Sequence, residues 1–106
     1  MPNSQYLPKI SLEQWAAFRA VVEEGSFAKA ADKLNKSQSS ISYTLGQLAA
    51  QLPVPALEIS GRKAQLTAAG QVFYRQACSL LDAATALEAG AVRLAQGWEG
   101  EVTLAI

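Results

Sequence analysis

The stretch SQSSISYTLGQL, residues 37–48, concentrates side chains whose types and spacing suit contact with another molecule. Ile41, Leu45 and Leu48 recur at the three- to four-residue spacing of one buried helix face. The other face would carry short hydrogen-bonding groups, one aromatic ring and one glycine: Gln38, Ser39, Ser42, Tyr43 and Gly46. Hydroxyls and amides donate and accept hydrogen bonds, so this face suits the polar edge of a partner.

A solvated helix surface is the plainer interpretation of the same face. Such surfaces are usually rich in Glu, Lys and Arg, which favour helix formation more than serine does. Gly46 alone would cost up to ~1 kcal/mol relative to alanine in a helix interior. Because these residues are poor choices for stability, the pattern favours recognition.

The rest of the chain offers little for catalysis or for a bound cofactor. It contains no histidine and one cysteine, so Cys78 can form neither a Cys–His nucleophilic pair nor an internal disulfide. The sequence shows no cluster of metal-ligand residues, and GSFAKAADK lacks the spacing of a phosphate-binding loop. We therefore expect no enzyme activity, no metal and no cofactor.

Charge is distributed unevenly, although the 106 residues sum to zero net charge. Residues 26–75 hold six cations and two carboxylates, a net charge of +4, and the remainder carries −4. This asymmetry favours the hypothesis of an anionic partner, and an ordinary scatter of surface charges is the alternative. No apolar run approaches the ~18 residues of a membrane span, and the N-terminus lacks the features of a signal peptide. The single cysteine fits a reducing cytoplasm.

Capping residues divide the first half of the chain into three short helices. Ser11, Ser26 and Ser37 are candidate N-caps, and SLEQ has the spacing of a capping box. Gly25 and Asn35 can adopt the left-handed conformation that ends a helix. The prolines of LPVP would stop the third helix.

A hairpin and a long helix are expected to follow. ALEISGRKAQLT, residues 56–67, reads as two extended runs around a turn at Gly61. Thr67 would cap a helix from Ala68 to about Gln96, which GWEG would end. The alternating EVTLAI would be a lone strand, so the chain is expected to stop just inside a second domain.

The second and third helices are joined only by Asn35 and Lys36, which predicts a helix-turn-helix. The second helix of such a motif lies in the DNA major groove, with its N-terminal residues at the base edges. Gln38 can form two hydrogen bonds with adenine, and serine can serve several bases. Five cations would attract the phosphate backbone, those at the hairpin tip also reaching a minor groove: Lys29, Lys33, Lys36, Arg62 and Lys63.

The long helix carries an a/d heptad, the pattern of a coiled-coil seam. Its members alternate intervals of four and three: Phe73, Ala77, Leu80, Ala84, Leu87, Ala91, Leu94 and Trp98. A lone helix with such a seam needs a partner, so we predict a homodimer. A second row, Cys78, Leu81 and Thr85, would pack the helix onto its own domain.

Together these motifs resemble the N-terminal region of LysR-type transcriptional regulators, over roughly residues 12–106. The resemblance rests on FRAVVEEGSFAKAADKLNKSQSSIS, on GRKAQLTAAG and on the long helix after them. It implies a mainly α fold: a winged helix-turn-helix of three helices and a two-stranded wing, then a dimerisation helix that pairs antiparallel with its copy. The expected divisions are a DNA-binding domain at 1–67, a linker helix at 68–97, and a hinge with the first strand of an effector domain at 98–106.

The resemblance also implies roles for individual positions. It assigns base reading to Gln38, Ser39, Ser42 and Tyr43, the phosphate backbone to Ser26, Phe27 and Ser37, and the minor groove to Arg62. Six positions depart from the family: Ser39, Tyr43, Gly46, Ala49, Pro53 and Ile59. Ser39 stands where proline is frequent, and Tyr43 and Gly46 stand where arginine or lysine is frequent.

The leading interpretation is a cytoplasmic, sequence-specific DNA-binding transcriptional regulator. Its expected partners are double-stranded promoter DNA and a second copy of itself, with a tetramer as an option at full length. A small-molecule inducer would act only through the effector domain, and no membrane is implied. The alternative is a protein–protein interaction module that dimerises through the heptad helix, and an enzyme is the weakest class.

Overall fold

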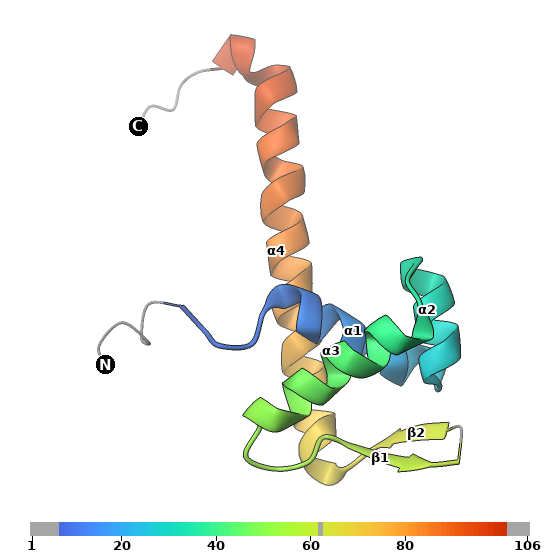
Figure 1. Cartoon of the computed structure of the whole chain (residues 1–106). Coiled ribbons are helices and arrows are strands. Elements are labelled where there is room, and N and C mark those ends of the chain that lie inside the picture. Colours follow the sequence, from blue (N-terminus) through green and yellow to red (C-terminus); the bar gives the residue numbers. More distant parts are fainter. Residues whose placement is uncertain (1–6, 62, 102–106) are drawn as a thin grey trace.

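A computed structural model describes residues 7–61 and 63–101, and the side chains of residues 7–61 and 63–97. It contains three short helices, a two-stranded hairpin and one long helix. Figure 1 shows the short helices and the hairpin gathered beside the first turns of α4, whose remaining length projects away from them. This confirms the predicted mainly α, winged helix-turn-helix fold followed by a long helix.

The short helices are α1 (Leu12–Glu24), α2 (Phe27–Leu34) and α3 (Gln38–Gln51). Serine hydroxyls accept the first free backbone N–H groups of all three, as predicted, at Ser11, Ser26 and Ser37. The capping box of α1 is complete, because the side chain of its third residue also accepts from the cap N–H. Left-handed residues then end α1 at Gly25 (φ 84°) and α2 at Asn35 (φ 61°), so the chain reverses sharply twice.

The core lies where these three helices meet. Phe18, Val21, Ile41 and Leu48 are its largest fully buried side chains. α2 contributes Ala30 and Ala31, both buried, whose small side chains let its backbone approach α1 and α3 closely. The apolar stripe of α3 therefore faces inward and leaves its polar residues outside.

The wing is an antiparallel hairpin of β1 (Leu57–Ser60) and β2 (Lys63–Leu66). Ser60 pairs with Lys63 at the closed end of the hairpin. Gly61 has a positive φ of 61°, which suits a two-residue turn. The Ala64 N–H donates to the Gly25 carbonyl over 3.2 Å, and this bond ties the wing to the end of α1.

The first turns of α4 (Ala68–Glu101) belong to the core of the same domain. The Thr67 hydroxyl caps the helix by accepting from the Gly70 N–H at 2.9 Å, as predicted. Ala77 is only 2% exposed and Leu81 is also buried, so the predicted packing row is confirmed at Leu81. Cys78 is half-buried, whereas Thr85 is exposed and lies beyond the packed region.

Two predictions about α4 are wrong. Ala77 is not available to a dimer seam, because the core formed by the short helices covers it. The helix also does not end near Gln96 but runs through GWEG to Glu101. Each glycine costs up to ~1 kcal/mol, but extending an existing helix adds a hydrogen bond without a new nucleation step. The remainder of the predicted strand, residues 102–106, lies outside the described residues. None of the described helices is long and apolar enough to span a bilayer.

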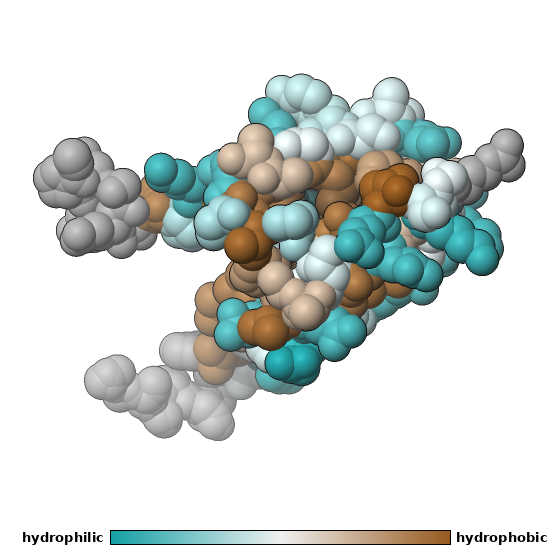
Figure 2. All heavy atoms as spheres, turned by 90° about the horizontal axis from the view of Figure 1, so that it is seen from below, coloured by the Kyte–Doolittle hydropathy of each residue, from teal (hydrophilic) through white to brown (hydrophobic). Residues whose placement is uncertain are grey.

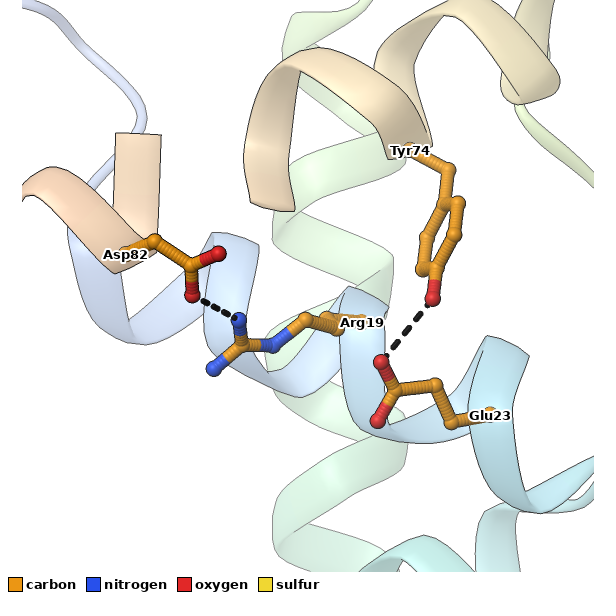
Figure 3. Close-up of polar contacts among 4 residues, drawn as sticks. All are labelled: Arg19, Glu23, Tyr74 and Asp82. Carbon is orange, nitrogen blue, oxygen red and sulfur yellow. Dashed lines mark hydrogen bonds and ion pairs between the residues drawn. The ribbon is translucent and has the colours of Figure 1, made fainter. Parts of the chain in front are cut away.

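Two polar contacts join α4 to α1 beside this packed region (Figure 3). Arg19 donates to the Asp82 carboxylate at 3.2 Å, and the Tyr74 hydroxyl donates to the Glu23 carboxylate at 2.9 Å. Arg19 and Glu23 lie one helical turn apart on α1, whereas Tyr74 and Asp82 lie two turns apart on α4. The two contacts therefore fix the direction in which α4 leaves the domain.

Tyr74 is expected to ionise at a higher pH than a free tyrosine. The nearby Cys78 thiol, the hydrogen bond to Glu23 and burial together raise the pKa of the Tyr74 hydroxyl above its ordinary value of 10.0. The folded state then holds this proton more tightly than the unfolded state does. The resulting stabilisation is complete below about pH 10 and is lost as the pH rises through the raised pKa.

Tyrosinate absorbance measured during an alkaline titration checks this expectation. The difference between wild type and Tyr74→Phe isolates one hydroxyl, and its midpoint should lie above that of the same difference in urea. Circular dichroism confirms that the chain is folded at each pH. Equal midpoints in the two states would contradict the assignment.

Candidate nucleic-acid interface

The outer face of α3 carries the polar residues singled out from the sequence. All five are exposed, in the order Gln38, Ser39, Ser42, Tyr43 and Gly46. They stay together because the buried stripe of Ile41, Leu45 and Leu48 fixes the rotation of the helix against the core. The face can therefore enter a groove without disturbing the packing of the domain.

Tyr43 is the largest side chain on this face and is 68% exposed. Its hydroxyl accepts a hydrogen bond of 3.0 Å from the side-chain Nε2 of Gln47, one turn further along α3. Gln47 was not among the predicted site residues. The four-residue interval between two polar side chains is the only signal in the sequence that points to it.

Ser26 and Ser37 stand at the N-termini of α2 and α3 and use their oxygen atoms as caps. Each accepts a backbone N–H at 3.1 Å, from Lys29 and Ser40 respectively. A hydroxyl that accepts one hydrogen bond still has a proton to donate. Ser26 can therefore cap a helix and donate to an anion. The Ser37 hydroxyl also lies 3.3 Å from the Ser39 hydroxyl, so it can donate to an anion when Ser39 is the donor of that pair. The positive ends of two helix dipoles lie beside the two caps.

A groove lies between the start of α2, the start of α3 and the wing. Its lining joins residues distant in the sequence: Ser26, Phe27, Ala28, Gln38, Ile59, Gly61 and Lys63. Phe27 is half-buried and also packs against the core, so its ring shapes the floor of this groove. Ala28 and Ile59 are residues that sequence reasoning missed, because only the folded hairpin brings β1 near α2.

The predicted cations fall into two groups. Lys29 and Lys63 line one hollow beside Ser26, where the wing meets the start of α2. Lys33 and Lys36 instead form ion pairs with α1, at 3.3 Å to Glu24 and 3.4 Å to Glu13. Arg62, the predicted minor-groove residue, lies outside the described residues.

The wing lies next to α3 across an apolar hollow lined in part by Leu45, Leu52, Leu57 and Ile59. Figure 2 views the molecule from below and shows apolar patches interrupting a hydrophilic surface on this side. The hairpin and the outer face of α3 therefore border the same hollow and lie on one side of the domain. A long polar partner can therefore contact both elements at once.

Comparison with known proteins fits this geometry. Residues 12–71 match the model of the family described as bacterial regulatory helix-turn-helix protein, lysR family. The chain belongs to the lysR family. The matched residues include α1, α2, α3 and the wing, so the winged helix-turn-helix of this chain is the helix-turn-helix region that the family shares.

Curated relatives of this lysR-family chain are named as transcriptional regulators. The probable HTH-type transcriptional regulator YhaJ of Escherichia coli K12 is 36% identical over 95 residues, which are 90% of this chain and 32% of that protein. A probable RuBisCO transcriptional regulator of Cyanidioschyzon merolae is 46% identical over 71 residues, 67% of this chain and 23% of that protein. The chain therefore spans less than a third of the length of these relatives.

Solved structures of the lysR family superpose on the chain. The DNA-binding domain of BenM in complex with catB site 1 DNA gives a TM-score of 0.77 at 37% identity, covering 82% of this chain and 97% of that one. The DNA-binding domain of CbnR in complex with DNA gives 0.73 at 36% identity, covering 80% and 98%. In both, the matched region is a DNA-binding domain that was solved with DNA.

Proposed function

We propose that this lysR-family chain binds double-stranded promoter DNA sequence-specifically through α3 and the wing, as a homodimer formed through α4. The observation that carries the proposal is the exposed face of α3, which is polar and uncharged and lies beside a groove lined by Lys63, with Lys29 in the neighbouring hollow. A face of this kind suits base edges, and the adjacent lysines suit phosphates.

The roles divide by chemistry. Four residues at the start and centre of α3 read base edges in the major groove: Gln38, Ser39, Ser42 and Tyr43. Phosphates lie against the hydroxyls of Ser26 and Ser37 and the ammonium groups of Lys29 and Lys63. Arg62 at the hairpin turn extends into the adjacent minor groove.

The second partner is another copy of the chain. Beyond the packed region, α4 exposes an apolar row at Leu80, Leu87 and Leu94, with Ala84 and Ala91 between them. Pairing two such rows covers apolar surface that a monomer leaves in water. Residues 1–67 then form the DNA-binding domain and α4 the dimerisation helix. The paired α3 helices would read half-sites about one helical turn, ~34 Å, or a multiple apart.

The longer regulator implied by the relatives carries further roles. An effector domain after α4 would bind a small-molecule inducer and permit a tetramer, and the whole protein would work in the cytoplasm. None of these roles needs a cofactor or a metal in the residues described here.

Binding of this chain to labelled DNA from upstream of its own gene tests the proposal. A retarded complex should form on that DNA and not on a scrambled duplex of equal composition, and its affinity should fall steeply as salt rises. Equal binding to both duplexes, or no binding at low salt, would overturn sequence-specific recognition.

Replacing Gln38 and Lys63 should have different consequences. Gln38→Ala should relax specificity at one base pair by about 1–3 kcal/mol, because an amide can bond two atoms of adenine. Lys63→Ala should weaken binding equally on all sequences. It should also reduce the slope of log affinity against log salt concentration by about one, because one phosphate contact is lost. Lys33→Ala is the matched control, since its ammonium is paired with Glu24, and should change affinity less than Lys63→Ala does. Affinities measured on a set of single-base variants at three salt concentrations separate these outcomes.

A protein–protein module remains the second candidate because Leu87 on α4 is 75% exposed. Sedimentation with and without DNA separates the two functions. A dimer that never co-sediments with any duplex would favour the second.

A further inference from the structure

The contact between Tyr43 and Gln47 determines which hydrogen bond Tyr43 can offer to DNA. Gln47 Nε2 donates to the Tyr43 hydroxyl oxygen over 3.0 Å, and the two side chains lie one turn apart on the exposed face of α3. Among residues 7–61 and 63–97 this is the hydroxyl's only hydrogen bond within the protein. The Tyr43 ring is exposed to solvent, and its hydroxyl is contacted only by the Gln47 amide among these residues.

A phenol hydroxyl has one proton to donate and an oxygen that accepts. Gln47 supplies a proton to the oxygen, so the proton of Tyr43 has to point to another acceptor. Among the described residues the Tyr43 proton has no protein acceptor, and the Ser39 hydroxyl one turn earlier lies instead 3.3 Å from the Ser37 hydroxyl. Gln47 thus occupies the accepting oxygen of the Tyr43 hydroxyl and leaves the hydroxyl proton free to be donated.

We propose that Tyr43 is a specificity-determining residue whose hydroxyl donates a hydrogen bond to an acceptor on a base edge. Gln47 is the positioning residue that keeps this hydroxyl a donor toward the DNA. The inference rests on the proposed DNA binding of α3. In the major groove, guanine presents two adjacent acceptors, O6 and N7, whereas cytosine presents only the N4 donor. Tyr43 therefore favours guanine and rejects cytosine at the base it faces.

The same chemistry says what a change at Gln47 does. Gln47→Leu removes the amide donor, so the Tyr43 hydroxyl can either donate or accept. Base edges that present an acceptor and base edges that present a donor should then bind about equally well. Glutamate at neutral pH is only an acceptor, so the Tyr43 proton turns toward it and leaves the oxygen to accept. Gln47→Glu should then exchange guanine for a base with a donor, adenine or cytosine.

Selection from a random duplex pool, followed by titration of single-base variants, tests the inference with this chain. Wild type should prefer guanine over cytosine at one position by about fivefold or more, the discrimination expected of one hydrogen bond. Tyr43→Phe and Gln47→Leu should both reduce that preference to less than about twofold and leave the other positions unchanged. Gln47→Glu should reverse it, even where its charge weakens binding overall. Gln51→Leu, at an exposed glutamine one turn further along α3, is the matched control and should match wild type.

The outcomes separate the inference from the function on which it rests. If wild type selects no sequence, the proposed DNA reading fails and the inference fails with it. If wild type is selective and Tyr43→Phe keeps every preference, Tyr43 does not determine specificity and only the inference is overturned. If Gln47→Leu retains the guanine preference that Tyr43→Phe loses, Gln47 is not the positioning residue. Thermal unfolding of each variant confirms that the fold is unchanged.

Discussion

Leu87→Asp is expected to convert the chain from a dimer to a folded monomer. Leu87 is 75% exposed at the centre of the unpacked part of α4, so the monomer loses no internal contact. In a dimer, the new carboxylate would be buried against the apolar row of the partner helix without a counter-charge. DNA with two half-sites should then bind at least about a hundredfold more weakly, because the second domain is no longer tethered to the first.

Analytical ultracentrifugation and titration of one-half-site and two-half-site duplexes measure this result. Affinity for a single half-site should be unchanged, since Leu87 belongs to the later turns of α4 (Ala68–Glu101), which project away from the short helices (Figure 1). Ala89→Asp places the same charge at an exposed position on the opposite side of the helix and should remain dimeric. A Leu87→Asp chain that still sediments as a dimer would refute the apolar row as the interface.

Gly70→Ala is expected to destabilise the domain, although alanine favours helices. Gly70 is buried in the first turn of α4, and a Cβ atom there would overlap the backbone carbonyl of Ala56. That carbonyl cannot move freely because it accepts from the Thr67 N–H at 3.1 Å, and the Thr67 hydroxyl donates to the neighbouring Pro55 carbonyl at 2.7 Å. Overpacking of this kind costs about 2–3 kcal/mol, roughly 10–20 °C in Tm for a domain of this size.

Thermal and urea unfolding followed by circular dichroism check the prediction. Gly46→Ala is the matched control, because a Cβ atom on that exposed residue of α3 meets open space. It should raise the free energy of unfolding by up to ~1 kcal/mol, the ordinary helix preference for alanine over glycine. The two substitutions should therefore have opposite signs, and two stabilising effects would show that the Gly70 backbone contact is not tight.

Some parts of the candidate site could be predicted from the sequence, and others could not. The polar face of α3 was predictable because a helix with one apolar stripe has only one way to face a core, and the caps at Ser26 and Ser37 are local signals. The pairing of Lys33 and Lys36 with α1 was not predictable, since carboxylates distant in sequence meet them only after α1 and α2 pack. The same holds for the groove that joins Lys63 to Gln38.

The sequence by itself determined the elements and the ends of the short helices, but not the end of α4. Serine caps, Gly25, Asn35 and the helical spacing of apolar residues act over three or four residues, so they can be read without knowing what the helix packs against. Tertiary structure decided how the heptad of α4 is used. A heptad describes one side of an isolated helix, but the short helices cover that side as far as Ala77 and leave it exposed at Leu80, Leu87 and Leu94. Whether a residue of α4 is buried depends on which other elements pack against it, and only the folded chain specifies that packing.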